Sequence, residues 1–211
     1  MALETWLLFC TVGLAAALSP GPAILLAITN GVAGGGRRVV WSSLGNIVGL
    51  LLISCVSIFG LGALLKASAA AFTVTKVVGA AYLVWLGIKQ WRRPATGLSD
   101  ASPAIASGTR DAVHLAREGA LVALTNPKAI VFFTALFPVF LDARQALAPQ
   151  FAIMTATMMA LSFICLMGYG LMARRVRHWL ATPRHHRMFQ RVTGSVFIVM
   201  GGSLLTLTRS R

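Results

Sequence analysis

The chain has 211 residues, of which 57% are hydrophobic and 11% are charged, and its mean hydropathy is +0.77. These residues supply too little polar surface to cover a water-soluble domain of this length, so the composition excludes that class and predicts an integral membrane protein. The net charge of +14 does not indicate a nucleic-acid partner, because the basic residues are divided among several connections without interleaved exposed aromatics. We expect them to meet anionic lipid headgroups.

Six predominantly apolar segments have, or approach, the roughly 20 residues with which a helix crosses a bilayer. They span residues 6–28, 39–65, 72–88, 119–141, 147–173 and 192–208. The predicted fold class is therefore all-α, a polytopic membrane protein with six transmembrane helices. The segment between the third and fourth spans, residues 93–117, is rich in Pro, Ser, Ala, Gly and Thr and is expected to be a cytoplasmic linker.

The first apolar segment resembles a secretory signal, because three alanines at residues 15–17 imitate a cleavage site. A signal peptide begins with basic residues, whereas Glu4 is the charged residue that precedes this segment, so we expect the segment to remain as a helix. Asn30 is expected to end it. The glycines that follow, at positions 31 and 34–36, predict a mobile turn.

Proline interrupts the first and fourth segments in similar sequence. Residues 17–24 read Ala-Leu-Ser-Pro-Gly-Pro-Ala-Ile, and residues 123–130 read Ala-Leu-Thr-Asn-Pro-Lys-Ala-Ile. Proline lacks a backbone N–H and clashes with the preceding turn, so each break frees backbone groups that hydrocarbon cannot satisfy. In secondary transporters, interrupted helices at matching positions of two repeats mark the substrate site near the midplane of the membrane.

A second internal match supports a duplicated architecture. Residues 76–84 align with residues 191–199, which pairs the third segment with the sixth. Three helices per half is an odd number, so the two halves would insert with opposite orientation as a 3+3 inverted repeat with broken helices one and four. The predicted units are a first repeat at 1–92, the linker at 93–117 and a second repeat at 118–211. Chance similarity between short Gly-, Ala- and Val-rich spans is the alternative.

Most of the 19 Lys and Arg residues follow the first, third and fifth segments. Because cytoplasmic loops retain basic residues, both termini are predicted on the non-cytoplasmic side of a bacterial cytoplasmic (inner) membrane.

Two polar side chains stand inside predicted spans. Lys128 lies well within the fourth segment, where a charge costs about 2.5–3.5 kcal/mol on insertion scales, so a compensating role is expected. It could balance a substrate carboxylate or change its protonation during transport; alternatively, it reaches an interface or bonds carbonyls. Asn46 in the second segment could bond a neighbouring helix or contact substrate.

The acidic residues avoid the span interiors. Glu118 and Asp142 stand at opposite ends of the fourth segment, where they could gate entry and exit, take part in proton transfer, or simply mark the limits of the helix. The single cysteines and the loop histidines have no metal-ligand spacing, so no metal and no cofactor are predicted. No intramembrane nucleophile with an acid or base partner is evident, and an enzyme is not expected.

Several of these motifs together resemble the LysE/RhtB family of amino-acid exporters. The resemblance rests on residues 19–22, on Gly45-Asn46 with Gly49, on the Lys76 to Gly87 pattern, and on residues 126–128 followed by Pro138 and Phe140. It covers nearly the whole chain in order. It implies a six-helix inner-membrane protein that expels amino acids or close derivatives and is driven by the proton gradient.

The predicted function is therefore that of a secondary transporter exporting amino acids or close derivatives by proton antiport. An efflux transporter for another small solute or cation, or a non-transport membrane subunit, remains the alternative. The expected partners are a small-molecule amino-acid substrate and membrane lipid, and a glycine-rich surface would permit a homodimer. The candidate substrate-binding residues are Ser19, Pro20, Gly21, Pro22, Asn46, Thr125, Asn126, Pro127 and Lys128.

Overall fold

The computed structural model describes residues 1–19, 21–67, 69–92, 111–142, 145–173, 175 and 182–206, and their regular elements are all helices. Pro20 and most of the predicted linker lie outside these residues. The helices are α1 (Leu3–Leu18), α2 (Pro22–Ala67), α3 (Ala69–Arg92), α4 (Ala112–Leu124), α5 (Pro127–Val131), the π-helical segment η2 (Phe132–Leu136), α6 (Phe137–Phe140), α7 (Leu147–Leu171) and α9 (Pro183–Thr206).

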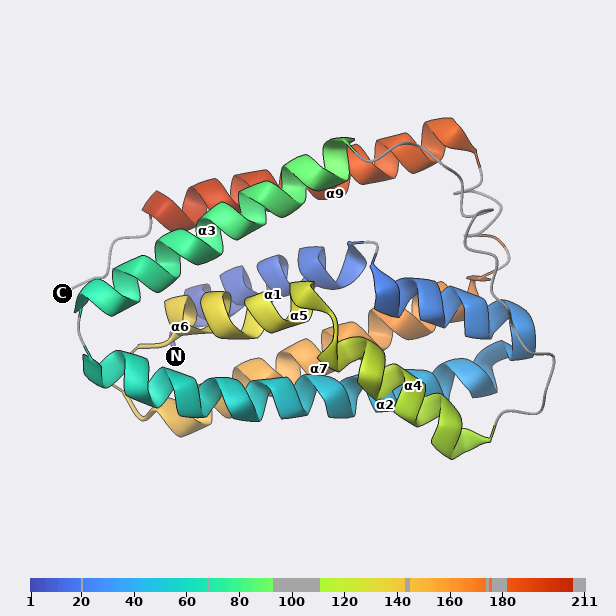
Figure 1. Cartoon of the computed structure of the whole chain (residues 1–211), viewed down its shortest axis with the longest axis horizontal. Coiled ribbons are helices and arrows are strands. Elements are labelled where there is room, and N and C mark those ends of the chain that lie inside the picture. Colours follow the sequence, from blue (N-terminus) through green and yellow to red (C-terminus); the bar gives the residue numbers. More distant parts are fainter. Residues whose placement is uncertain are drawn as a thin grey trace.

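The helices run roughly along the long axis of the molecule (Figure 1). α1 and the first part of α2 follow one another in one direction, and the remainder of α2 returns beside them. α4, α5, η2 and α6 form a second interrupted rod, which runs opposite to α1 at the centre of the molecule. α3 packs against α9, and α2 packs against both α4 and α7. α1 and the first part of α2 form the first interrupted rod, and it lies beside the second one at the centre of the molecule (Figure 1).

Length and composition make several helices compatible with a membrane. Pro22–Ile58 within α2 and Leu147–Leu171 are long and apolar enough to cross a bilayer. Ala112–Leu124 and Pro127–Phe140 pass the same test together, bent by 57° at the break between them. The protein is thus an all-helical membrane protein in its described part.

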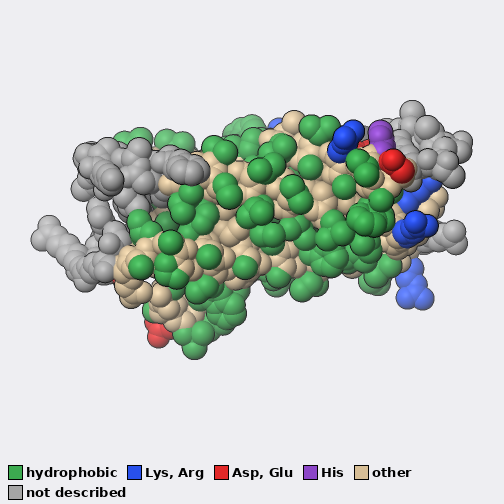
Figure 2. Space-filling model, turned by 90° about the horizontal axis from the view of Figure 1, so that it is seen from below, with side chains coloured by type: hydrophobic (Ala, Val, Ile, Leu, Met, Phe, Trp, Pro, Cys, Tyr) green, Lys and Arg blue, Asp and Glu red, His purple; other side chains and the backbone are tan. Residues whose placement is uncertain are grey.

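Large apolar side chains are exposed at the surface while several polar ones are buried. Val56 in α2 is 72% exposed and Leu3 in α1 is 68% exposed, whereas Ser54 is fully buried. The hydrophobic side chains cover much of the face shown in Figure 2. Ser42, Ser43, Asn46 and Ser57 of α2 are likewise buried. A helix that hides its polar side and exposes its apolar side is suited to contact with lipid.

Asn30 does not end the first apolar helix, contrary to the sequence-based expectation. It is buried within α2, and the helical backbone is interrupted four residues later, at Gly34 and Gly35. Gly35 has a φ of 68°, the left-handed conformation that glycine adopts without a steric penalty. The chain therefore turns where glycine permits it, and not at the polar residue.

Candidate substrate site

The first break frees two carbonyls for a reason that can be read from the sequence. In an α-helix the carbonyl of residue i accepts the N–H of residue i+4. The N–H groups that would donate to the Ala16 and Leu18 carbonyls belong to positions 20 and 22, and both positions hold proline, which has no N–H. Two carbonyls at the end of α1 thus have no main-chain donor of their own helix.

Side chains from distant helices supply the missing donors. The Lys128 Nζ donates to the Ala16 carbonyl at 2.8 Å and to the Ser19 carbonyl at 2.9 Å. The Tyr169 hydroxyl of α7 donates to the Leu18 carbonyl at 3.0 Å. The C-terminal end of a helix carries partial negative charge, so a lysine ammonium is electrostatically favoured at the end of α1. These contacts tie α1 to α5 and α7.

The second break is satisfied by its own neighbours. α4 ends at Leu124, and the Asn126 N–H donates to the Ala123 carbonyl, which would otherwise await the N–H that Pro127 lacks. The Asn126 side chain caps α5 by accepting the main-chain N–H of Lys128 at 3.1 Å. Proline is well tolerated at the first position of the new helix. The bend is therefore encoded by these few residues.

A fourth proline, Pro138 at the start of α6, acts in the same way on the preceding η2. In a π-helix the bond runs from residue i to i+5, and the Phe137 N–H donates to the Phe132 carbonyl accordingly. The next carbonyl, that of Phe133, would await the N–H of Pro138, which does not exist. The Ser57 hydroxyl of α2 donates to it at 2.7 Å. Single π turns of this kind are frequent at functional sites.

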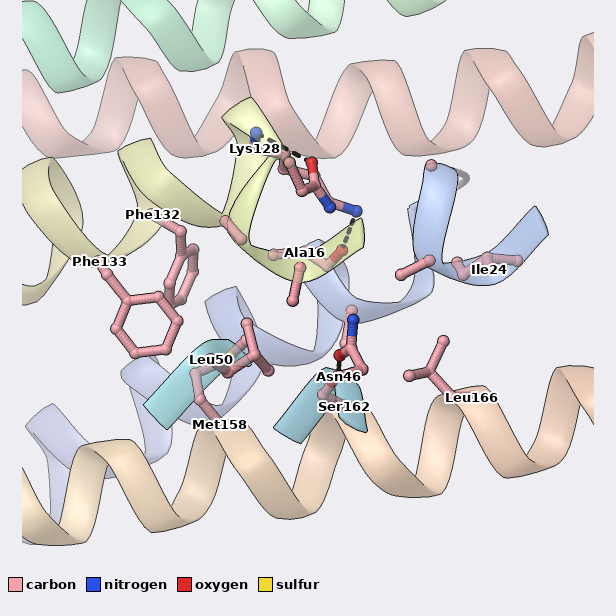
Figure 3. A pocket seen from close by; sticks show the side chains of 16 residues that line it. Ala16, Ile24, Asn46, Leu50, Lys128, Phe132, Phe133, Met158, Ser162 and Leu166 are labelled. Carbon is pink, nitrogen blue, oxygen red and sulfur yellow. Dashed lines mark hydrogen bonds between the residues drawn. The ribbon is translucent and has the colours of Figure 1, made fainter. Parts of the chain in front are cut away.

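A cavity of about 50 Å³ lies between the two breaks. Its lining comes from both interrupted rods together with α2 and α7 (Figure 3). The residues are Ala16, Ala17, Gly21, Ala23, Ile24, Asn46, Leu50, Ala123, Asn126, Lys128, Ala129, Phe132, Phe133, Met158, Ser162 and Leu166. Since one water needs about 10–15 Å³ of cavity volume, the cavity has room for a few waters in this conformation.

The polar groups of the cavity lie on two sides of it. Lys128 stands at one side with its ammonium directed at the Ala16 carbonyl, and Asn46 stands at the other, where its side-chain oxygen accepts from the Ser162 hydroxyl at 3.2 Å (Figure 3). Among the described residues, no carboxylate pairs with Lys128. An ammonium has three N–H donors, and two of them are used on carbonyls, so one remains for a ligand.

Two hydrophobic clusters enclose the cavity. The aromatic cluster surrounds Phe9 and Phe137, whose rings lie 5.4 Å apart edge to face, and it supplies Phe132 and Phe133 to the cavity wall. The aliphatic cluster comprises Ile24, Ala27, Ile28, Val39, Leu166 and Ala173. A broader hollow lies beyond it, lined by Gly31, Gly35, Arg175 and their neighbours. The cavity thus lies between an aromatic cluster and an aliphatic one, each of which contributes residues to its lining.

Comparison with known proteins identifies the family. Residues 14–208 match the family described as LysE type translocator. The chain belongs to this family. It is 36% identical to an uncharacterized membrane protein of Vibrio cholerae, with 98% of each chain covered. It is 34% identical to the homoserine/homoserine lactone efflux protein of Salmonella typhimurium over 97% of each chain, and 28% identical to a leucine efflux protein of Klebsiella pneumoniae over 90% of this chain and 89% of that one.

No solved structure matches the chain. The resemblance to the LysE family that the sequence motifs indicated is confirmed by the family match. The family is described as translocators and the relatives with functional names are efflux proteins, so the comparisons support a transport protein.

The cavity of this LysE family protein contains part of the predicted residue set. Gly21, Asn46, Asn126 and Lys128 line it. Ser19 is buried beside it and contributes its carbonyl to Lys128.

The other predicted positions do not line the cavity. Pro22 and Pro127 are exposed first residues of their helices. Thr125 is also exposed, and its hydroxyl bonds the Leu121 carbonyl of its own helix. Pro20 lies outside the described residues.

Glu118 and Asp142 lie away from the cavity, towards opposite ends of the second interrupted rod. Glu118 is half-buried in α4. Asp142 follows α6, where its backbone N–H and carbonyl both bond the side chain of Gln150. No group of three or more His, Cys, Asp and Glu residues that could hold a metal occurs in the part of the chain that the structure describes.

Several residues of the site were not identified from sequence. Ser162 has the same signal as Asn46, a polar side chain within an apolar span, and could have been found by it. Tyr169 and Ser57 could not be identified from their positions in the sequence. The prolines indicate only that some side chain must donate to the carbonyls of Leu18 and Phe133. Phe132 and Phe133 carry no local signal, because phenylalanine is ordinary in an apolar helix.

Proposed function

We propose that this protein is a secondary transporter that exports amino acids or close derivatives across the bacterial cytoplasmic membrane. The observation that carries the proposal is the Lys128 ammonium, which lines the cavity between two broken helices. A half-buried cation with one donor unused suits a ligand that brings a carboxylate. The efflux proteins named among the relatives supply the transport context.

The proposed binding mode uses both ends of the first break. α2 begins at Pro22, and the first turn of a helix offers free N–H groups and partial positive charge to a carboxylate. Ala23 and Ile24 of that turn line the cavity opposite the end of α1. Lys128 would complete the carboxylate site, Asn46 and Asn126 would add hydrogen bonds, and the phenylalanines would contact an apolar side chain.

We further propose the six-span topology with 3+3 inverted repeats, comprising residues 1–92 and 118–211 joined by the 93–117 linker, whose last residues, 112–117, form the start of α4. Counterpart helices pack against each other in the structure, as α3 does with α9 and α2 with α7. Basic side chains gather at the end of the molecule where the Gly35 kink and the start of α4 lie (Figures 1 and 2). By the positive-inside rule that end is cytoplasmic, and both termini are then outside.

Transport through this site requires the two hydrophobic clusters to separate in turn. The cavity volume of about 50 Å³ is too small for most amino acids, so a loaded site must be larger than the one described. Opening of the aliphatic cluster would admit substrate from the cytoplasmic hollow, and opening of the aromatic cluster would release it outside. We propose that proton antiport drives the cycle, with Lys128, Glu118 and Asp142 as the candidate proton-linked groups.

The experiment is amino-acid export from cells that lack their own exporters. Cells would be loaded with dipeptides that contain homoserine, leucine and other amino acids, and release would be followed with and without the protein. The wild type is expected to accelerate release of one or a few amino acids. Lys128→Met should lower the initial rate roughly 10- to 100-fold, the worth of one charge-assisted hydrogen bond.

Lys89→Met is the matched control, because Lys89 is exposed at the end of α3, where it stands over the Trp85 ring. It should export at the wild-type rate. A protonophore should stop export if protons drive it. Persistent flux would reject the antiport mechanism but not the export function. Normal export by a correctly inserted Lys128→Met variant would reject the proposed site, and no release of any amino acid by the wild type would reject the function.

A further inference from the structure

The ammonium of Lys128 already occupies a small built site. Its Nζ contacts the carbonyls of Ala16 and Ser19 at 2.8 and 2.9 Å, and those contacts are its hydrogen bonds among the described residues. The Ala16 carbonyl has no donor of its own helix because position 20 is proline. Both carbonyls belong to the negatively polarised end of α1. Nothing in this arrangement is specific for lysine, because any primary ammonium would satisfy it.

This carbonyl pair opens onto the cavity. Ala16, Gly21 and Lys128 are all lining residues, and the cavity continues from them towards Asn46. Gly21 has no side chain, and a Cβ placed there would lie 3.6 Å from the Nζ and 3.9 Å from the Cε of Lys128. The flexible lysine stem is therefore not confined on that side, and its ammonium has a route from the carbonyls into the cavity.

We propose that the Ala16 and Ser19 carbonyls form the subsite for the ammonium of the transported amino acid, and that Lys128 fills this subsite in the empty protein as a substitute for substrate. The inference rests on the proposed function and deepens it. On binding, the substrate ammonium takes the two carbonyls, and the displaced Lys128 ammonium bonds the substrate carboxylate. The Ala16 carbonyl, which proline deprives of its helical donor, and the Ser19 carbonyl thus keep a donor in both states.

The exchange defines the ligand class. A molecule needs a primary ammonium for the carbonyls and, a few bonds away, an anionic group that receives the displaced Lys128. A ligand with the ammonium alone would leave two cations in one small cavity, so Lys128 disfavours amines that lack a carboxylate. Lys128 is then a specificity-determining residue, and removal of its charge should improve the binding of such amines.

The test measures ligand-dependent thermal stability of the purified full-length protein in detergent. Glycine, glycinamide and N-acetylglycine are the probes, because they are small enough for the result not to depend on which side chain the pocket accepts. The variants are Lys128→Met, which empties the subsite, Lys128→Arg, which keeps a cation, and the control Lys89→Met.

At a concentration about ten times its Kd, glycinamide should raise the melting temperature of Lys128→Met by about 3 °C or more. It should shift the wild type, Lys128→Arg and Lys89→Met by less than a third as much. N-acetylglycine, which lacks an ammonium, should shift none of them. Equal shifts by glycinamide in wild type and Lys128→Met, no shift in either, or a shift by N-acetylglycine would overturn the inference.

A second measurement covers the case in which Lys128→Met does not fold. Lys128→Gln would replace it in the thermal assay, and inhibition of labelled amino-acid transport would be measured with wild-type inverted vesicles. Glycine should inhibit at least tenfold more strongly than N-acetylglycine, and equal inhibition would reject the subsite. If amino acids are exported but these patterns fail, only the subsite is wrong; if no amino acid is exported, the proposed function fails first.

Discussion

The two helix breaks begin from similar sequence but are held in different ways. At the second break, the cap and the turn are made by residues within a few positions of Pro127. At the first, the carbonyls of Ala16 and Leu18 accept hydrogen bonds from the side chains of Lys128 and Tyr169, which lie more than a hundred residues away in the sequence. The second bend is thus a local property of the chain, whereas the first depends on the packing of the other half. A movement of α5 or α7 relative to α1 must change the hydrogen bonds of the first break.

The helix before the second break packs backbone to backbone against α2, and the largest expected effect removes that contact. A Cβ on Gly119 of α4 would clash with the Ser42 carbonyl of α2, which is main chain and cannot rotate away. Gly119→Ala should lower the free energy of unfolding by about 1–3 kcal/mol. Gly168→Ala is the matched control, because its Cβ meets nothing within 4 Å. It should stabilise α7 by about 0.5–1 kcal/mol, measured by thermal unfolding in detergent.

The second break should respond to loss of its cap. Asn126→Ala removes the acceptor for the Lys128 N–H and should cost about 1 kcal/mol of stability. Asn126→Ser restores a capping oxygen and should recover most of that loss. Transport separates the two roles of this residue: if Asn126→Ser is stable but exports slowly, the amide contacts substrate as well as capping α5. A stable Asn126→Ala variant would show that the bend does not depend on the cap.

The smallest effect tests the remote bond at the first break. Tyr169→Phe removes the donor to the Leu18 carbonyl and should cost about 0.6 kcal/mol, typical of a side-chain hydrogen bond in a membrane protein. The other tyrosine of the chain is the control, because the Tyr82 hydroxyl is buried without a hydrogen-bond partner among the described residues. Tyr82→Phe should therefore leave stability unchanged or raise it. Equal losses in both variants would mean that the Leu18 carbonyl needs no donor.

The predictable part of this molecule is the part that short sequence segments determine. Proline acts within one turn, so interruptions of the first and fourth segments were expected close to where α1 and α4 end. The cost of a charge in hydrocarbon identified Lys128 without any knowledge of its neighbours. The same reasoning misjudged Asn30, because a buried position in a long helix outweighed its weak tendency to end one.

Features that depend on tertiary packing were not predictable. A single sequence says that the Leu18 and Phe133 carbonyls need donors, but not that Tyr169 and Ser57 supply them. The π-helical register of η2 differs from an α-helix by one hydrogen-bond step, and no residue between 132 and 136 signals it. Thr125 was grouped with the site by its place beside Pro127, but its direction is set by the last turn of α4.

The π turn has a consequence for the geometry of the second rod. A π turn holds more residues than an α turn, so η2 contains surplus chain that a regular helix of the same length would not accommodate. If the Phe133 carbonyl lost its bond to Ser57, the extra residue of the π turn could move to another position in the rod. α6 would then rotate about the helix axis by about 100° for each residue moved. Phe137 and Phe140 would turn away from Phe9 while the Asn126 cap stayed in place. Such a shift would reorient the aromatic end of the rod while its capped end, beside Lys128, kept its position.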